Sequence, residues 1–204
     1  MSDRPIYVQG DLSELPTSKD GPASLAWWGN AGFMLIEGTA FLLAGGSYLY
    51  LMVASPDWPP KGFAPPQLIW GIVFTIGLLL SEIPNRWLRA KARAKNEKAV
   101  RIGIIIMTLA AFLLFIPRAL EFTVLGLRWD EHAYGSVLWM LMILHTVHLI
   151  TDWGDTLVLA IWLHTHEVGD RQFADVEDNA NYWRFVELSW LPLYALIYWA
   201  PRLA

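Results

Sequence analysis

The stretch at 132–164 combines length, apolar character and four ionisable side chains. It is longer than the roughly 20 residues that a helix needs to cross a bilayer. Within it, His145, His148, Asp152 and Asp155 follow one another at spacings of three, four and three residues. At about 100° per residue, these spacings place the four side chains on one narrow face of a helix. Because ionisable groups are costly in hydrocarbon, we expect this face to contact protein or water instead of lipid.

The whole chain has the composition of an integral membrane protein. Of its 204 residues, 55% are hydrophobic and 17% are charged, whereas soluble domains average about 25% charged residues. The 12 Trp and 7 Tyr residues fit the aromatic belts of membrane proteins. The net charge of -4 argues against binding to nucleic acid. The absence of cysteine excludes disulfides, iron–sulfur clusters and thiolate metal sites.

The hydrophobic segments predict an all-α bundle of five transmembrane helices. The polar segment 1–24 lacks the basic start and apolar core of a signal peptide, and we expect it to form a cytoplasmic tail. The proline-rich segment 55–66 predicts a loop, and the polar, acidic segment 165–179 separates the last two spans. The five spans are predicted at about 25–54, 67–88, 100–127, 132–164 and 180–200, within one domain at 25–204.

Basic residues predict how the bundle is oriented. Seven Lys or Arg residues lie in the segment 86–101, between the second and third spans. By the positive-inside rule this segment is cytoplasmic, where it meets anionic headgroups. Five spans then place the N-terminus in the cytoplasm and the C-terminus outside. No internal repeat and no inverted pair of broken helices is visible, which weakens the case for a secondary transporter.

Several charged groups lie at membrane depth, and we predict that they form a buried polar network. Glu37 in the first span is at a similar depth to Asp152 and Asp155, while Arg118 of the third span reaches towards the two histidines. Two interpretations remain open: a proton path, or hydrogen-bonded groups that hold the helices together. The predicted members are Glu37, Arg118, Glu121, His145, His148, Asp152, Asp155, Arg184 and Glu187.

Arg184 and Glu187 are three residues apart on the fifth span. This spacing places both side chains on one side of a helix. We predict that they join the polar network of the fourth span.

The sequence predicts no catalytic residue and no metal ligand. It shows no nucleophile–base pair, phosphate-binding loop or dinucleotide-binding turn. His145 and His148 could hold a metal together with Glu121 or Asp152. However, a di-iron carboxylate bundle needs two Glu-x-x-His units, and two histidines on one face of one helix cannot clamp a haem iron from both sides. The lack of visible chemistry favours a subunit of a larger assembly.

Short motifs in the later spans carry a family resemblance. YGS at 134–136 precedes HTVHL at 145–149, and NYWRFVE at 181–187 leads to WLPLY at 190–194 and IYW at 197–199. These motifs resemble those of subunit III of the haem–copper oxidases, the cytochrome c oxidase and quinol oxidase superfamily. Two shorter matches extend the resemblance towards the N-terminus, and they are RALEF at 118–122 and Ile36-Glu37.

The resemblance implies a non-catalytic, cofactor-free subunit of a terminal oxidase that couples electron transfer to oxygen with proton pumping. It implies that haem and copper lie in subunit I, against which this chain packs, and that subunit II and small subunits complete the complex. It also implies bound phospholipid, support of proton uptake and oxygen access, and location in a bacterial inner membrane. The five spans resemble a shorter bacterial form that lacks the first two of seven helices.

Carried over by position, Glu37 matches the buried carboxylate of the family and His148 matches a histidine near cleft lipid. We add Trp28 and Arg171 to these two as lipid-binding candidates. The chain departs from the family pattern at Thr146, Asp152, Arg184 and Glu187. Three alternatives remain: a nitric-oxide-reductase-associated relative, a stand-alone transporter or metal-binding protein that uses the His145–Asp155 face, and a haem-bearing anchor.

Overall fold

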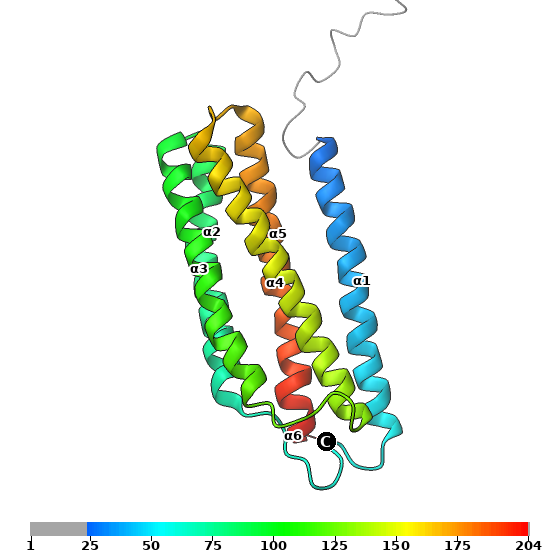
Figure 1. Cartoon of the computed structure of the whole chain (residues 1–204). Helices are drawn as coiled ribbons and strands as arrows, with labels where there is room; N and C mark the ends of the chain where they lie inside the picture. Colours follow the sequence, from blue (N-terminus) through cyan, green and yellow to red (C-terminus); the bar gives the residue numbers. More distant parts are fainter. Residues whose placement is uncertain (1–23, 204) are drawn as a thin grey trace, which may run out of the picture.

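The computed structural model describes residues 24–203, which form a bundle of long helices (Figure 1). No β-strand occurs in this part of the chain. Only Ser24 of the predicted tail at 1–24 lies within the described residues, where it caps the first helix. The helices are α1 (Leu25–Ala54), α2 (Leu68–Arg93), α3 (Glu97–Thr123), α4 (Ala133–Thr165) and α5 (Asp170–Tyr194), which continues into the π-helix η1 (Ala195–Trp199) and α6 (Ala200–Leu203). The prediction of an all-α membrane bundle is confirmed.

Four of these helices, α1 to α4, are long and apolar enough to cross a membrane. The more polar α5 begins at Asp170, whereas the sequence prediction started the fifth helix near residue 180. The polar segment hides an apolar face: Phe173, Val176 and Ala180 recur at helical spacing and are buried. The Gln172 side chain accepts a hydrogen bond from the Gly169 backbone N–H at 2.9 Å, which caps the start of the helix.

The basic segment 86–101 is mostly helical instead of being a loop. α2 runs on to Arg93, α3 begins at Glu97, and only residues 94–96 turn between them. The Asn96 side chain accepts a hydrogen bond from the backbone N–H of Ala99 and so caps α3. The third helix ends at Thr123, slightly before its predicted end near residue 127.

Close helix packing builds the core. α2 and α3 form one antiparallel side of the bundle, α4 crosses the view diagonally, and α1 stands at the opposite side against α4 and α5 (Figure 1). Glycine permits the closest approach: a Cβ on Gly71 of α2 would lie 2.8 Å from the hydroxyl oxygen of Tyr198. A Cβ on Gly103 of α3 would lie 2.8 Å from Cδ1 of Leu88. Such small residues are typical of helix contacts within membranes.

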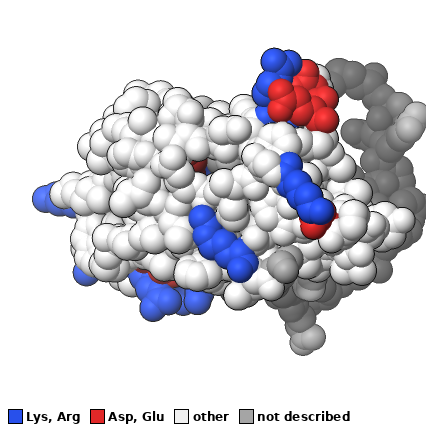
Figure 2. Space-filling model, turned by 90° about the horizontal axis from the view of Figure 1, so that it is seen from below, with Lys and Arg blue, Asp and Glu red and all other residues white. Residues whose placement is uncertain are grey.

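The C-terminal end of α1 is fixed by a cluster of aromatic rings. Tyr48 is fully buried and accepts a hydrogen bond from Nε1 of Trp58 at 3.0 Å. The Trp58 ring in turn packs edge-on against Tyr134 of α4, with centroids 4.8 Å apart. Seen from below, this end of the bundle is largely uncharged, with a few scattered basic and acidic side chains (Figure 2). The other half of α1 stands farther from α4 (Figure 1), and its Asn30 donates a hydrogen bond to the Asp178 carbonyl oxygen of α5 at 2.9 Å.

Candidate functional site

A cleft of about 860 Å³ opens between the N-terminal half of α1 and the facing parts of α4 and α5. Its walls include apolar side chains such as Phe33, Val147 and Trp162. Acidic side chains greatly outnumber basic ones in the lining. The ionisable residues of the cleft are Glu37, His148, Asp152, Asp155, Arg171, Asp175, Asp178 and Tyr182.

Glu37 occupies the middle of the cleft and contacts both facing helices. Its Oε2 accepts a 2.6 Å hydrogen bond from the hydroxyl of Tyr182 on α5. Its Oε1 lies 3.2 Å from Nε2 of His148 on α4. The other ring nitrogen of His148, Nδ1, lies 2.6 Å from the carbonyl oxygen of Leu144. A carbonyl only accepts, so Nδ1 carries a proton, and one further proton is needed between Nε2 and the Glu37 carboxylate. The two side chains therefore form a proton-sharing pair.

Asp152 lies on the same side of α4 and is 1% exposed. Within the described chain, neither of its carboxylate oxygens has a hydrogen-bond partner. Leaving a buried carboxylate without partners costs free energy, so this residue destabilises the isolated chain. Asp155, one turn further, is exposed, and its Oδ2 lies 3.4 Å from Nδ2 of Asn179.

The cleft thus gathers five of the predicted site residues and leaves others out. Glu37, His148, Asp152, Asp155 and Arg171 all line it. Trp28, predicted as a lipid contact, is 63% exposed and is not among the residues that line the cleft.

A second group lies apart from the cleft, inside the bundle. Arg118 pairs with Glu121 at 2.7 Å, and both side chains are almost completely buried. Glu121 also accepts a 2.6 Å hydrogen bond from the hydroxyl of Tyr198. Nη2 of Arg118 lies 3.1 Å from Nδ1 of His145, whose Nε2 lies 3.1 Å from the carbonyl oxygen of Val186. Nε2 therefore donates and Nδ1 accepts, which makes His145 a neutral imidazole.

Aromatic rings enclose the same guanidinium. Its carbon lies 3.7 Å from the ring centroid of Phe74 and 4.2 Å from that of Trp190. Cation–π contacts of this kind stabilise a cation that has been removed from water. Because His145 is occupied by Arg118 and Val186, it is not available to the cleft.

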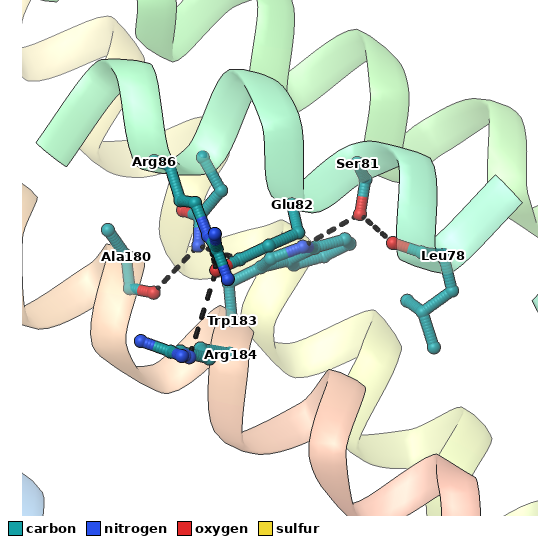
Figure 3. Close-up of polar contacts among 8 residues, drawn as sticks. Leu78, Ser81, Glu82, Arg86, Ala180, Trp183 and Arg184 are labelled. Atoms are coloured by element: carbon teal, nitrogen blue, oxygen red, sulfur yellow. Dashed lines mark hydrogen bonds and ion pairs between the residues drawn. The ribbon is translucent and has the colours of Figure 1, made fainter.

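A third group connects α2 with α5 (Figure 3). Oε1 of Glu82 accepts a hydrogen bond from Nε of Arg86 at 2.9 Å and lies 3.7 Å from Nε of Arg184. Asn85 donates both to Oε2 of Glu82, at 2.9 Å, and to the carbonyl oxygen of Ala180, at 3.0 Å.

The third group corrects two sequence predictions. The charged neighbours of buried Glu187 are Glu82, Arg86 and Arg184, so Arg184 and Glu187 face α2 and do not join the polar residues of α4. Arg184 is exposed, as is Asp155 of the cleft, whereas both were predicted to be buried. The predicted single network is therefore three separate groups, because neighbouring positions on one helix face different partner helices.

The residues of these groups that the sequence prediction missed include Tyr182, Tyr198, Glu82 and Asn85. The two tyrosines look like ordinary interfacial aromatics in a sequence. Glu82 had a detectable signal, because it lies inside an apolar span four residues before Arg86. The described residues contain no group of three or more His, Cys, Asp or Glu side chains that could hold a metal ion.

Comparison with known proteins identifies the family. The family model described as cytochrome c oxidase subunit III matches residues 49–201, which excludes the α1 side of the cleft with Phe33 and Glu37 but includes the second and third groups. Similar proteins include cytochrome c oxidase subunit 3 of Chondrus crispus, 29% identical over 146 residues, which are 70% of this chain and 53% of the relative. That of Drosophila yakuba is 27% identical over 183 residues, covering 84% of this chain and 68% of the relative.

The rat protein of the same name is 29% identical over 146 residues, covering 70% of this chain and 55% of the relative. The chain spans about half the length of several of the curated relatives that it matches. The family model, in contrast, covers most of this chain, from α1 to α6. The chain therefore belongs to the cytochrome c oxidase subunit III family.

Proposed function

We propose that this chain is an auxiliary, non-redox subunit of a respiratory haem–copper oxidase. The observation that carries the proposal is the family match over residues 49–201 of a multi-pass helical bundle. We place the chain in a bacterial inner membrane, with its N-terminus in the cytoplasm and its C-terminus outside. The basic residues at the α2–α3 turn support this orientation.

The proposed partner is subunit I of the oxidase, which holds the haems and copper, with subunit II and small subunits in the same complex. Large apolar side chains cover the outer surface of the bundle, including Leu35, Leu42 and Val53, which are 71%, 77% and 83% exposed. Such a surface suits either lipid or another membrane-spanning subunit. A subunit with this surface contributes to the complex by packing against other subunits and by holding lipid beside them.

Phospholipid is the proposed occupant of the cleft. The apolar walls suit acyl chains, Arg171 near the start of α5 provides a contact for a headgroup, and Glu37 and His148 line the cleft at greater depth. The proton-sharing pair of Glu37 and His148 lies in the same space and supports a role in holding protons for uptake by the oxidase. Asp152, with two unpartnered oxygens beside the cleft, is the next acceptor.

The test is gentle detergent purification through an affinity tag on this chain. A reduced-minus-oxidised spectrum and mass spectrometry of the co-purifying proteins and lipids are the measurements. Haem bands together with a large many-spanning partner are expected. A colourless chain that purifies alone would overturn the oxidase proposal and favour a stand-alone transporter. Haem retained by the isolated chain would overturn the non-redox assignment.

A further inference from the structure

The line along which α2 packs against α5, named the α2–α5 groove, carries Arg86 and Arg184 at one depth. Nε of Arg93 lies 2.8 Å from Oε2 of Glu177, which fixes the level of one helix against the other near the α2–α3 turn. Seven residues further into the bundle lie Arg86 on α2 and Arg184 on α5. Seven residues are two helical turns, or about 10 Å. Both guanidinium groups therefore reach the same level, on either side of Glu82 (Figure 3).

The two arginines retain unused hydrogen-bond donors. Each directs Nε towards Glu82, and their side chains are 69% and 45% exposed. A guanidinium has five N–H donors in a rigid fork, and within the described chain the terminal nitrogens of Arg86 and Arg184 make no hydrogen bond. Nε of nearby Arg89 also lacks a partner.

The formal charges of the groove favour an anion. Three arginines, at 86, 89 and 184, meet two carboxylates, those of Glu82 and Glu187. Three other basic groups at this end are already paired with carboxylates, and Lys91 lies over the Trp87 ring. Arg93 pairs with Glu177, Lys95 with Asp170 at 2.7 Å, and Arg101 with Glu97 at 2.8 Å. The groove therefore keeps one positive charge in excess of its carboxylates.

Apolar side chains surround the arginine pair. Ile83 and Trp87 of α2 are 67% and 39% exposed, and Leu188 of α5 is 54% exposed. Such a surface faces acyl chains, and arginines near the end of a span extend their guanidinium groups to the phosphate level of the bilayer. Basic pockets between transmembrane helices bind anionic lipid headgroups, and two forked guanidinium groups suit a phosphate.

We propose that Arg86 and Arg184 bind the phosphate of an anionic phospholipid in the α2–α5 groove. This site is separate from the cleft between α1, α4 and α5, and it requires no assignment of the cleft. Glu82 holds both guanidinium groups by Nε and leaves their terminal nitrogens for the phosphate oxygens.

The test compares two double variants of the complex purified through a tag on this chain. Arg86→Gln with Arg184→Gln removes the site, and Lys61→Gln with Arg128→Gln removes the same charge from exposed loop residues elsewhere. Each sample is delipidated, titrated with phosphatidylglycerol or phosphatidylethanolamine, and examined by native mass spectrometry. We expect the groove variant to bind phosphatidylglycerol about tenfold more weakly. Phosphatidylethanolamine, whose ammonium offsets its phosphate charge, should lose less affinity than phosphatidylglycerol in the groove variant, and the loop variant should bind both lipids as the unaltered complex does.

Three results would overturn the proposal. The first is equal phosphatidylglycerol binding by both double variants. The second is displacement of the lipid by inorganic phosphate at equal concentration, which would show a site for free phosphate. The third is loss of a protein subunit from the groove variant with its phosphatidylglycerol binding unchanged, which would show a protein contact. Arg86→Lys with Arg184→Lys keeps the charge without the fork, and partial recovery by this variant would support the proposal even if the glutamine variant assembles poorly.

Discussion

Nε2 of His148 lies 3.2 Å from Oε1 of Glu37, which joins α4 to α1 across the cleft. The contact needs a proton between Nε2 and Oε1, because Nδ1 of His148 donates its own proton to the Leu144 carbonyl and the Tyr182 hydroxyl donates its proton to Oε2 of Glu37. This pair therefore links a shared proton directly to the packing of α1 against α4.

Replacing the carboxylate of Glu37 should affect durability more than haem content. Glu37→Gln keeps an acceptor for Tyr182 but removes the charge opposite His148. We expect normal haem content, faster inactivation during turnover and less retained lipid, with about 1.5–3 kcal/mol of stability lost along with the charged hydrogen bond. Activity decay and lipid content are the measurements. Glu131→Gln, in an exposed loop, is the control, and equal decay in both variants would contradict the expectation.

Replacing Asp152 should raise the stability of the chain and slow proton uptake by the complex. Asp152→Leu removes two buried oxygens that have no hydrogen-bond partner within the described chain. The free energy of unfolding of the isolated chain should therefore rise by about 1–3 kcal/mol, measured by thermal unfolding. If Asp152 receives protons from the cleft, the same variant should slow proton uptake in the complex. Asp155→Asn, at an exposed position, should change neither quantity strongly. A less stable Asp152→Leu chain would refute the account of this residue.

The pair of Arg118 and Glu121 should be much more sensitive to single than to double replacement. Arg118→Met leaves the buried Glu121 carboxylate without its cation, which should cost about 3–5 kcal/mol of stability. Adding Glu121→Gln removes that charge while keeping an acceptor for Tyr198, and most of the loss should be recovered. Thermal unfolding of the four members of this cycle measures the coupling, and simple additivity would contradict a direct pair.

Gly71 should tolerate no larger side chain. A Cβ at this position would lie 2.8 Å from the Tyr198 hydroxyl oxygen, which is fixed by Glu121. Gly71→Ala should therefore destabilise the bundle by about 1–3 kcal/mol through overpacking. At Gly46 nothing lies within 4 Å of the corresponding Cβ, so Gly46→Ala is the matched control. Similar unfolding temperatures for the two variants would argue against close packing of α2 on η1.

Hydropathy revealed the helices of this chain because apolar length is a property of each segment alone. The start of α5 was hidden, since its apolar face at Phe173 and Val176 is narrow and acidic residues surround it. The C-terminal end of α2 and the start of α3 were not detected either. They lie in the basic segment, and Arg and Lys are good helix formers that also occur in cytoplasmic loops. Local composition thus located the membrane core better than it located the helix ends.

The polar groups were found one by one, but their pairing was not. The spacing of His145 and His148 placed both on one side of α4, yet one contacts Arg118 and the other contacts Glu37. Adjacent positions on a helix point towards different neighbours, and the choice depends on helix packing that no single segment encodes. The tyrosine partners escaped notice for the same reason, because only the assembled bundle shows which carboxylate each hydroxyl meets.

The attachment of α1 at Tyr48 would make a small rotation of this helix larger at its N-terminal end. Its aromatic attachment at Tyr48 lies about 33 Å along the axis from Ala26 at the open end of the cleft, and Glu37 lies about halfway between them. A rotation of about 5° at the attachment moves Ala26 by about 3 Å and Glu37 by about half as much. A molecule that widened the cleft by such a rotation would lengthen both the contact between Glu37 and His148 and the hydrogen bond from Asn30 to the Asp178 carbonyl oxygen. The size of the bound molecule would therefore set how far Glu37 stands from His148.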